Sequence, residues 1–275
     1  MQDCKVIALC NQKGGVGKTT TTANLGVGLA MLGKKVLLID ADPQGDLTTC
    51  LGWPDQENLS VTLQTQMKKV IYDEPIDPNA GILHHTEGVD LIPSNIELSE
   101  MEMTLVTAMN REHTLATYVN EIKGNYDYVL IDCMPSLGMT TINALVAADS
   151  VIIPVQAQYL SAKGMTQLVK TINKVKRQIK PNLKIDGVLL TLADMRTNFA
   201  KVTSEFIKQN YSGVIPIYDT VIPIAIKAAE TSAVGKSIYE YDKGSKVAEA
   251  YAQFSKEVLM DGEKQHHKAK STFSR

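Results

Sequence analysis

Lys13-Gly14-Gly15-Val16-Gly17-Lys18-Thr19 is the stretch of sequence that decides the fold. An apolar run rich in strand-forming residues, 5–11, leads into it, and residues 20–32 follow with a helical pattern that Gly33 closes. A glycine-rich turn between a strand and a helix leaves several backbone N–H groups aimed at one point, where the helix dipole adds positive potential. The stretch therefore predicts a site that holds phosphate groups.

This phosphate loop departs from the general pattern, which is Gly, four residues and then Gly-Lys-Ser/Thr. Gly17-Lys18-Thr19 matches the second half, but Gln12 stands where the first glycine is expected, and Lys13 adds a second lysine at the front. The arrangement resembles the deviant Walker A box of the ParA/MinD family of ATPases, in which the extra lysine is the signature. The alternative is a glycine turn with incidental lysines, and the strand before it and the helix after it argue against that interpretation.

Length and composition are those of one globular domain: 275 residues, of which 44% are hydrophobic and 21% charged. The formal net charge of −2 provides no overall attraction to nucleic acid, so DNA binding would need a local basic patch. The cysteines form no Cys-x-x-Cys pair, and no apolar stretch is long enough to span a bilayer. We expect a reduced, cytoplasmic setting, with no signal peptide and no membrane partner.

Apolar runs alternate with helical patterns along the whole chain. This alternation predicts an α/β fold with a doubly wound, mostly parallel sheet flanked by helices. We expect a single P-loop ATPase domain over residues 1–260, followed by a polar, flexible tail over residues 261–275. Ser94 and Ser99 are candidate helix N-caps, and Glu97 lies at capping-box spacing from Ser94. The expected later strands are 35–40, 89–93, 126–132, 150–155, 185–192, 213–217 and 220–223, and the expected later helices are 62–72, 100–109, 114–122, 137–148, 161–177, 198–210 and 243–259.

Acidic residues end two of the expected strands: Asp40, with Asp42 two residues later, and Asp132. Ligands of open parallel sheets bind at the carboxyl ends of the strands, so these acids should lie beside the phosphate loop. An apolar strand that ends in Asp is typical of the Walker B motif, whose carboxylate supports Mg²⁺. Neighbouring acids repel unless a cation or a water network uses them, which favours a metal site over a plain Asp-Pro turn at residues 42–43.

The resemblance to the ParA branch covers nearly the whole chain. Segments 40–45, 132–138, 196–198 and 235–236 carry it together with the loop. The chain is similar to the small Soj-type partition proteins rather than to the larger ParA proteins. The larger proteins have an N-terminal helix-turn-helix, for which a first strand beginning at Lys5 leaves no room.

The resemblance implies a role for each matching residue. Lys18 neutralises the β- and γ-phosphates, Asp42 positions the attacking water, and Lys13 reaches into the ATP of a partner subunit. These three are the expected catalytic residues. The expected ATP-binding residues are Gly14, Gly15, Val16, Gly17, Lys18, Thr19 and Thr20 at the phosphates, with Thr191 and Pro223 near the adenine; the expected Mg²⁺ residues are Thr19, Asp40 and Asp132.

The function implied by the resemblance is plasmid or chromosome partition. A homodimer sandwiches two ATP molecules, binds nonspecific double-stranded DNA on the nucleoid, and releases it when a ParB-like activator stimulates hydrolysis. Ile224 stands where Soj-like proteins carry the first of two arginines, so the DNA contact is the least secure part of the match. Candidate DNA-binding residues are Lys227, Lys236, Lys243 and Lys246.

Three alternatives remain open. A MinD-like membrane-cycling ATPase would need a C-terminal amphipathic anchor, but the tail has only Phe273 as a large apolar residue. A metabolic or redox enzyme, such as an ATP-dependent ligase or an iron–sulfur reductase, would share the scaffold, and Cys133 is the only cysteine near the expected switch loop. A nucleotide-gated scaffold with negligible turnover is the third alternative, and Asp42 argues against it.

Overall fold

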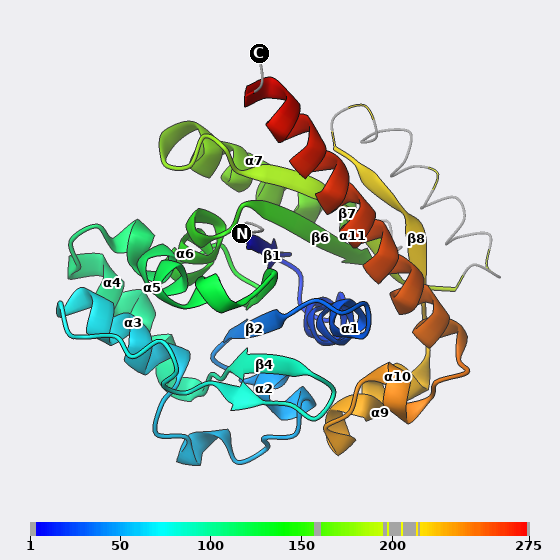
Figure 1. Cartoon of the computed structure of the whole chain (residues 1–275), viewed down its shortest axis with the longest axis horizontal. Helices are drawn as coiled ribbons and strands as arrows, with labels where there is room; N and C mark the ends of the chain where they lie inside the picture. The colour runs from blue at the N-terminus through cyan, green and yellow to red at the C-terminus, as the bar shows by residue number, and fades with distance from the viewer. Residues whose placement is uncertain are drawn as a thin grey trace.

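The structure, a computed structural model, describes residues 4–156, 161–194, 197, 205, 213 and 215–273. Within these residues the strands form one eight-stranded sheet in the order β3-β4-β2-β5-β1-β6-β7-β8 (Figure 1). Every neighbouring pair is parallel except β3 and β4, which confirms the doubly wound, mostly parallel sheet. The strands are β1 Lys5–Leu9, β2 Val36–Ala41, β3 Leu83–His84, β4 Val89–Ile92, β5 Tyr128–Cys133, β6 Ser150–Gln156, β7 Lys184–Ala193 and β8 Ile217–Pro223.

Helices cover both faces of the sheet (Figure 1). One face packs against α3 Leu63–Ile71, α4 Met101–Thr107, α5 Thr114–Ile122, α6 Met139–Ala147 and α7 Ser161–Gln178. The other face packs against α1 Lys18–Met31, α2 Asp46–Cys50, α9 Ile226–Val234, α10 Ile238–Tyr241 and α11 Lys246–Phe273. Short 3₁₀ turns lie at Gln56–Asn58, Ile96–Glu100, Arg111–His113 and Lys123–Asn125.

The central strands are apolar on both faces because both faces are covered. Along β1, Val6 and Ala8 belong to the core beneath α3 to α7, whereas Ile7 and Leu9 belong to the core beneath α1 and α11. This two-sided burial explains why the strands appear in the sequence as continuous apolar runs instead of an alternating pattern. No helix among the described residues is long and apolar enough to cross a membrane.

The structure differs from the sequence-based expectations at several points. Ser99 is not a helix N-cap, because α4 has Glu100 at its N-cap position and the Ser99 hydroxyl donates to the carbonyl oxygen of Ile96 at 2.7 Å. Asn95, not Ser94, caps the turn that begins at Ile96, and its side chain accepts the N–H of Glu97; Ser94 is fully buried instead. The strand expected at 220–223 begins earlier, as β8 Ile217–Pro223, and of the separate strand expected at 213–217 only residue 217 lies in it. The last helix begins at Lys246 and continues to Phe273, well past its expected end at residue 259.

Two expectations remain predictions. The expected helix at 198–210 and the matching segment 196–198 lie, apart from residues 197 and 205, outside the described residues. Division of the chain at residue 260, with a flexible tail after it, is also still a prediction.

Because the strands are parallel, the segments that follow β1, β2, β5, β7 and β8 all emerge at one edge of the sheet. This edge holds the candidate site.

Candidate functional site

A cavity of about 390 Å³ lies at the carboxyl ends of the strands. Its walls come from six segments that are distant in sequence and that the parallel sheet brings together. The lining residues are Gly14, Gly15, Gly17, Lys18, Thr19, Thr20, Asp42, Gln44, Asp46, Pro135, Thr191, Leu192, Ile222, Pro223, Ala225, Ala228 and Tyr251. Most of the residues expected at the nucleotide are therefore in one place, whereas Lys13, Val16, Asp40 and Asp132 do not line the cavity.

The phosphate loop presents its backbone to the cavity. Gly15 and Gly17 have φ angles of +68° and +81°, in the left-handed region that favours glycine. A Cβ atom added at Gly14 or Gly15 would meet nothing within 4 Å, so the space beside these two residues is open. Helix α1 begins directly after Gly17 with no side-chain cap and no acid in its first turn. Its first N–H groups and its dipole are therefore available to an anion.

Lys18 is the buried cation of the site, with 7% of its surface exposed. Within the described residues its Nζ meets only the carbonyl oxygen of Lys13, at 3.5 Å, and no carboxylate lies within ion-pair distance. A buried ammonium group without a paired acid is costly unless a ligand supplies the negative charge. Lys18 and the open loop therefore fit a polyphosphate ligand.

Thr191 links the phosphate loop to β7. Its hydroxyl donates a hydrogen bond of 2.7 Å to the carbonyl oxygen of Val16, and both residues are buried. The start of the loop is tied in a similar way: Asn11 donates to the carbonyl oxygen of Pro154 at 2.7 Å and accepts the N–H of Lys13 at 3.0 Å. Thr191 thus lines the cavity and also supports the loop, and Val16 contributes through its backbone.

Two buried carboxylates lie behind the cavity. Asp132 accepts hydrogen bonds from the hydroxyls of Thr19, at 2.7 Å, and Thr22, at 3.3 Å. Asp40 accepts the N–H and the hydroxyl of Thr48, at 2.9 and 2.7 Å. Burial, assisted by the Asp132 charge, raises the pKa of Asp40 to about 8, and burial raises the pKa of Asp132 to about 7.

Asp132 and Asp40 differ in how each could contribute to a metal site. Thr19 lines the cavity and is bonded to Asp132, so an ion bound at the Thr19 hydroxyl would have Asp132 directly behind it. The oxygens of Asp40 are occupied by Thr48 and by the N–H of Asp42. A cation would relieve the repulsion between the two acids, and this charge arrangement fits Mg²⁺.

Asp42 and Lys13 differ in their position relative to the cavity. Asp42 lines the cavity, its carboxylate accepts the N–H of Gln44 at 3.1 Å, and partial burial raises its pKa. The Lys13 side chain lies outside the cavity wall, with its Nζ 3.5 Å from the Oε1 atom of Gln156 at the end of β6. The Lys18 side chain is therefore buried in the loop, whereas the Lys13 side chain lies near the end of β6.

Sequence reasoning missed several residues of the cavity. Tyr251 lies in the apolar stripe of the last helix, yet it lines the cavity and its hydroxyl lies 3.3 Å from that of Thr21. Leu192 has a φ angle of +50°, at a point where the pairing of β7 with β8 shifts register. No local pattern marks either residue, because each reaches the cavity through a tertiary contact or a backbone irregularity.

The candidate DNA-binding lysines gather around α9, α10 and the start of α11. Two of them are paired with acids: Lys227 with Asp242 at 3.1 Å and Lys236 with Glu240 at 2.6 Å. Lys243 and Lys246 are exposed. The structure thus brings the four lysines to one region but neutralises two of them.

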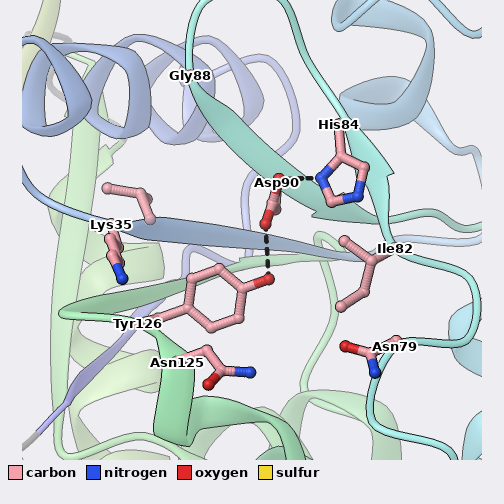
Figure 2. A pocket seen from close by; sticks show the side chains of 9 residues that line it. Lys35, Asn79, Ile82, His84, Gly88, Asp90, Asn125 and Tyr126 are labelled. Atoms are coloured by element: carbon pink, nitrogen blue, oxygen red, sulfur yellow. Dashed lines mark hydrogen bonds and ion pairs between the residues drawn. The ribbon is translucent and has the colours of Figure 1, made fainter.

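A second cavity, of about 340 Å³, lies at the opposite edge of the sheet (Figure 2). His84 and Tyr126 both point toward Asp90, whose carboxylate lies 2.6 Å from the His84 ring nitrogen and accepts the Tyr126 hydroxyl at 2.7 Å. Both Asp90 oxygens therefore have protein partners, and these contacts join β3 and β4 to the segment just before β5.

Comparison with known proteins identifies the family. A model of the AAA domain family matches residues 4–185. The sporulation initiation inhibitor protein Soj of Bacillus subtilis is 42% identical over 263 residues, which are 94% of this chain and 99% of Soj. The chain belongs to the ParA/MinD family. The chromosome partitioning protein ParA of Caulobacter vibrioides is 38% identical, over 93% of this chain and 94% of that protein.

Solved structures share the fold of this chain. Cobyrinic acid a,c-diamide synthase from Mycobacterium smegmatis, with bound ADP and magnesium, matches with a TM-score of 0.81 and 36% identity, over 94% of each chain. The MinD protein of Pyrococcus horikoshii, complexed with Mg-ADP, shares the fold with a TM-score of 0.73 at 24% identity. As a ParA/MinD member, the chain has a P-loop of the nucleotide-binding type, and its loop, Lys18 and carboxylates fit ATP and Mg²⁺.

Proposed function

We propose that this protein is an ATPase whose ATP-bound state is a homodimer, and that ATP hydrolysis returns it to monomers. The observation that carries the proposal is that the two lysines of the loop lie in different places. Lys18 is buried in the cradle, whereas Lys13 lies outside the cavity wall near Gln156. A cation on that side of the loop would face a second subunit across a two-fold axis.

Hydrolysis would use groups around the cavity. Bound Mg²⁺ would neutralise charge on the phosphates, with Thr19 as the nearest hydroxyl and Asp132 behind it. Asp42 is the carboxylate on the cavity wall that would position the attacking water, assisted by the charge of Lys18. Tyr251 and Pro223 lie in the apolar part of the same wall, which suits a nucleotide base.

Three variants test this proposal by equilibrium ATP binding and sedimentation. Lys18→Ala should lose ATP binding, whereas Lys13→Ala should bind ATP but fail to dimerise or turn over. Asp42→Ala should bind ATP and persist as a dimer, because the nucleotide is held but not cleaved. Lys34→Ala, which removes a lysine after α1, serves as the matched control and should behave as the wild type. An Asp42→Ala protein that stays monomeric in saturating ATP contradicts the dimer model.

The cellular role that we propose is plasmid or chromosome partition on the nucleoid, with a ParB-like activator. Soj and the chromosome partitioning proteins that this chain resembles over almost its full length support it. The dimer would bind nonspecific double-stranded DNA. Lys243 and Lys246, which form no ion pair within the part of the chain that the structure describes, are the candidates at the surface. Each phosphate contact contributes about −0.9 to the slope of log affinity against log salt, so Lys243→Ala should reduce the slope by about one.

Two rival functions have their own readouts. The match to cobyrinic acid a,c-diamide synthase favours a metabolic enzyme as the second candidate, and cobyrinic acid should leave ATP turnover unchanged if partition is correct. A MinD-like membrane cycle would appear as ATP-dependent sedimentation with anionic liposomes. An iron–sulfur role is disfavoured because Cys133 is buried against Cys10, with their sulfur atoms 2.9 Å apart.

A further inference from the structure

Helix α6 begins without a cap of its own. Its N-cap residue, Gly138, has no side chain to offer, and its first turn contains no acid. The missing cap comes from another helix: the Glu102 carboxylate of α4 accepts the N–H of Met139 through Oε2 and the N–H of Thr140 through Oε1, each at 2.9 Å. One side chain therefore satisfies two of the free N–H groups and places a negative charge at the positive end of the helix dipole.

The capped end of α6 is also the end of a loop at the nucleotide cavity. Residues 134–138 connect Asp132 and β5 to α6, and Pro135 lines the cavity. Ser136 fastens this loop to the helix, because its carbonyl accepts the Thr141 hydroxyl at 3.1 Å and its hydroxyl accepts the N–H of Gly138 at 3.2 Å. Movement of the first turn of α6 would therefore move the loop.

Glu102 lies on a helix that is anchored in the hydrophobic core. Its neighbours on α4, Met101 and Leu105, are fully buried in the core beneath the sheet. The fit is close on the other side too, since a Cβ atom at Gly138 would lie 2.7 Å from each Glu102 oxygen. The Glu102 carboxylate therefore packs directly against Gly138, and this contact connects α4 to the loop.

We propose that Glu102 is a positioning residue of the nucleotide site, which fixes the 134–138 loop by capping α6 from outside. This inference rests on the proposed ATPase function for its effect on turnover, but the capping itself can be measured without turnover. Glu102 does not line the cavity, so its loss should alter the arrangement of the site more than the affinity for nucleotide.

The first test is amide hydrogen exchange on the full chain. In Glu102→Ala the amides of Met139 and Thr140 should exchange about tenfold faster than in the wild type. Glu102→Gln, which keeps one acceptor oxygen but loses the charge, should give an intermediate rate. Glu97→Ala is the matched control, since it removes an exposed acid from the preceding turn and should leave both amides protected. Unchanged protection in Glu102→Ala overturns the proposal.

The second test separates positioning from simple destabilisation. Glu102→Ala should lower kcat for ATP about tenfold and change the Kd for ATP less than threefold, with Glu102→Gln between it and the wild type. Faster exchange with an unchanged kcat overturns the positioning role, and so does a loss of affinity as large as the loss of kcat. A wild-type protein with no turnover refutes the proposed function instead, and the exchange experiment then still decides whether Glu102 holds the loop.

Discussion

Replacing Thr191 with valine tests the support of the phosphate loop with almost no change of shape. The hydroxyl of Thr191 donates a 2.7 Å hydrogen bond to the carbonyl oxygen of Val16, and both residues are at most 1% exposed. Valine puts a methyl group in the place of the hydroxyl. The substitution therefore removes one bond and leaves a buried carbonyl oxygen without that partner.

The expected cost follows from these two effects. An ordinary buried hydrogen bond contributes about 1 kcal/mol, and an unsatisfied buried polar group costs about 1–3 kcal/mol, so we expect a loss of about 2 kcal/mol. For a domain of this size that loss lowers Tm by roughly 4–8 °C. If about 1.4 kcal/mol of the loss falls on the loop conformation that binds ATP, affinity for ATP decreases about tenfold.

Calorimetry and equilibrium binding of a fluorescent ATP analogue measure both quantities on Thr191→Val. Thr191→Ser is the control, since it keeps the hydroxyl and removes only a methyl group, and its affinity should stay within about threefold of the wild type. Wild-type affinity in Thr191→Val, or equal losses in both variants, would refute the idea that the hydrogen bond holds the loop.

Three further predictions follow from the geometry. Gly235→Ala should destabilise the protein by about 2 kcal/mol more than Gly33→Ala, because both glycines have positive φ but only Gly235 would bring a Cβ atom within 2.5 Å of a neighbouring backbone; equal denaturation midpoints would contradict this. In metal-free protein, the free energy of unfolding should fall by on the order of 3 kcal/mol between about pH 6 and about pH 9. The reason is that the pKa values of Asp40 and Asp132 are raised to about 8 and about 7, so these carboxyls bind protons more tightly in the folded state than in the unfolded state. Urea titrations that show rising stability over this range would be inconsistent with this expectation. Added Mg²⁺ and ATP should raise Tm in the wild type but not in Lys18→Ala, as a thermal shift assay would show, and an equal rise in both would place the nucleotide elsewhere.

The sequence by itself determined the architecture and the chemical centre of the site. Continuous apolar runs such as residues 126–132 identify strands buried on both faces, and the turn at residues 13–19 identifies a phosphate cradle from its glycines and lysines. Asp42 falls beside this cradle because the carboxyl ends of parallel strands meet at one edge. These inferences succeed because each depends on a local pattern or on a general rule of parallel sheets.

The tertiary structure decided the residues that support the site. Tyr251 joins the cavity from the last helix, Thr191 holds the phosphate loop from β7, and Glu102 caps a helix that begins 37 residues later in the chain. The cap at Asn95 instead of Ser94 and the pairing of two candidate DNA-binding lysines with acids were decided in the same way. Each of these contacts joins side chains whose proximity depends on how the elements pack, and a local sequence pattern carries no record of that packing.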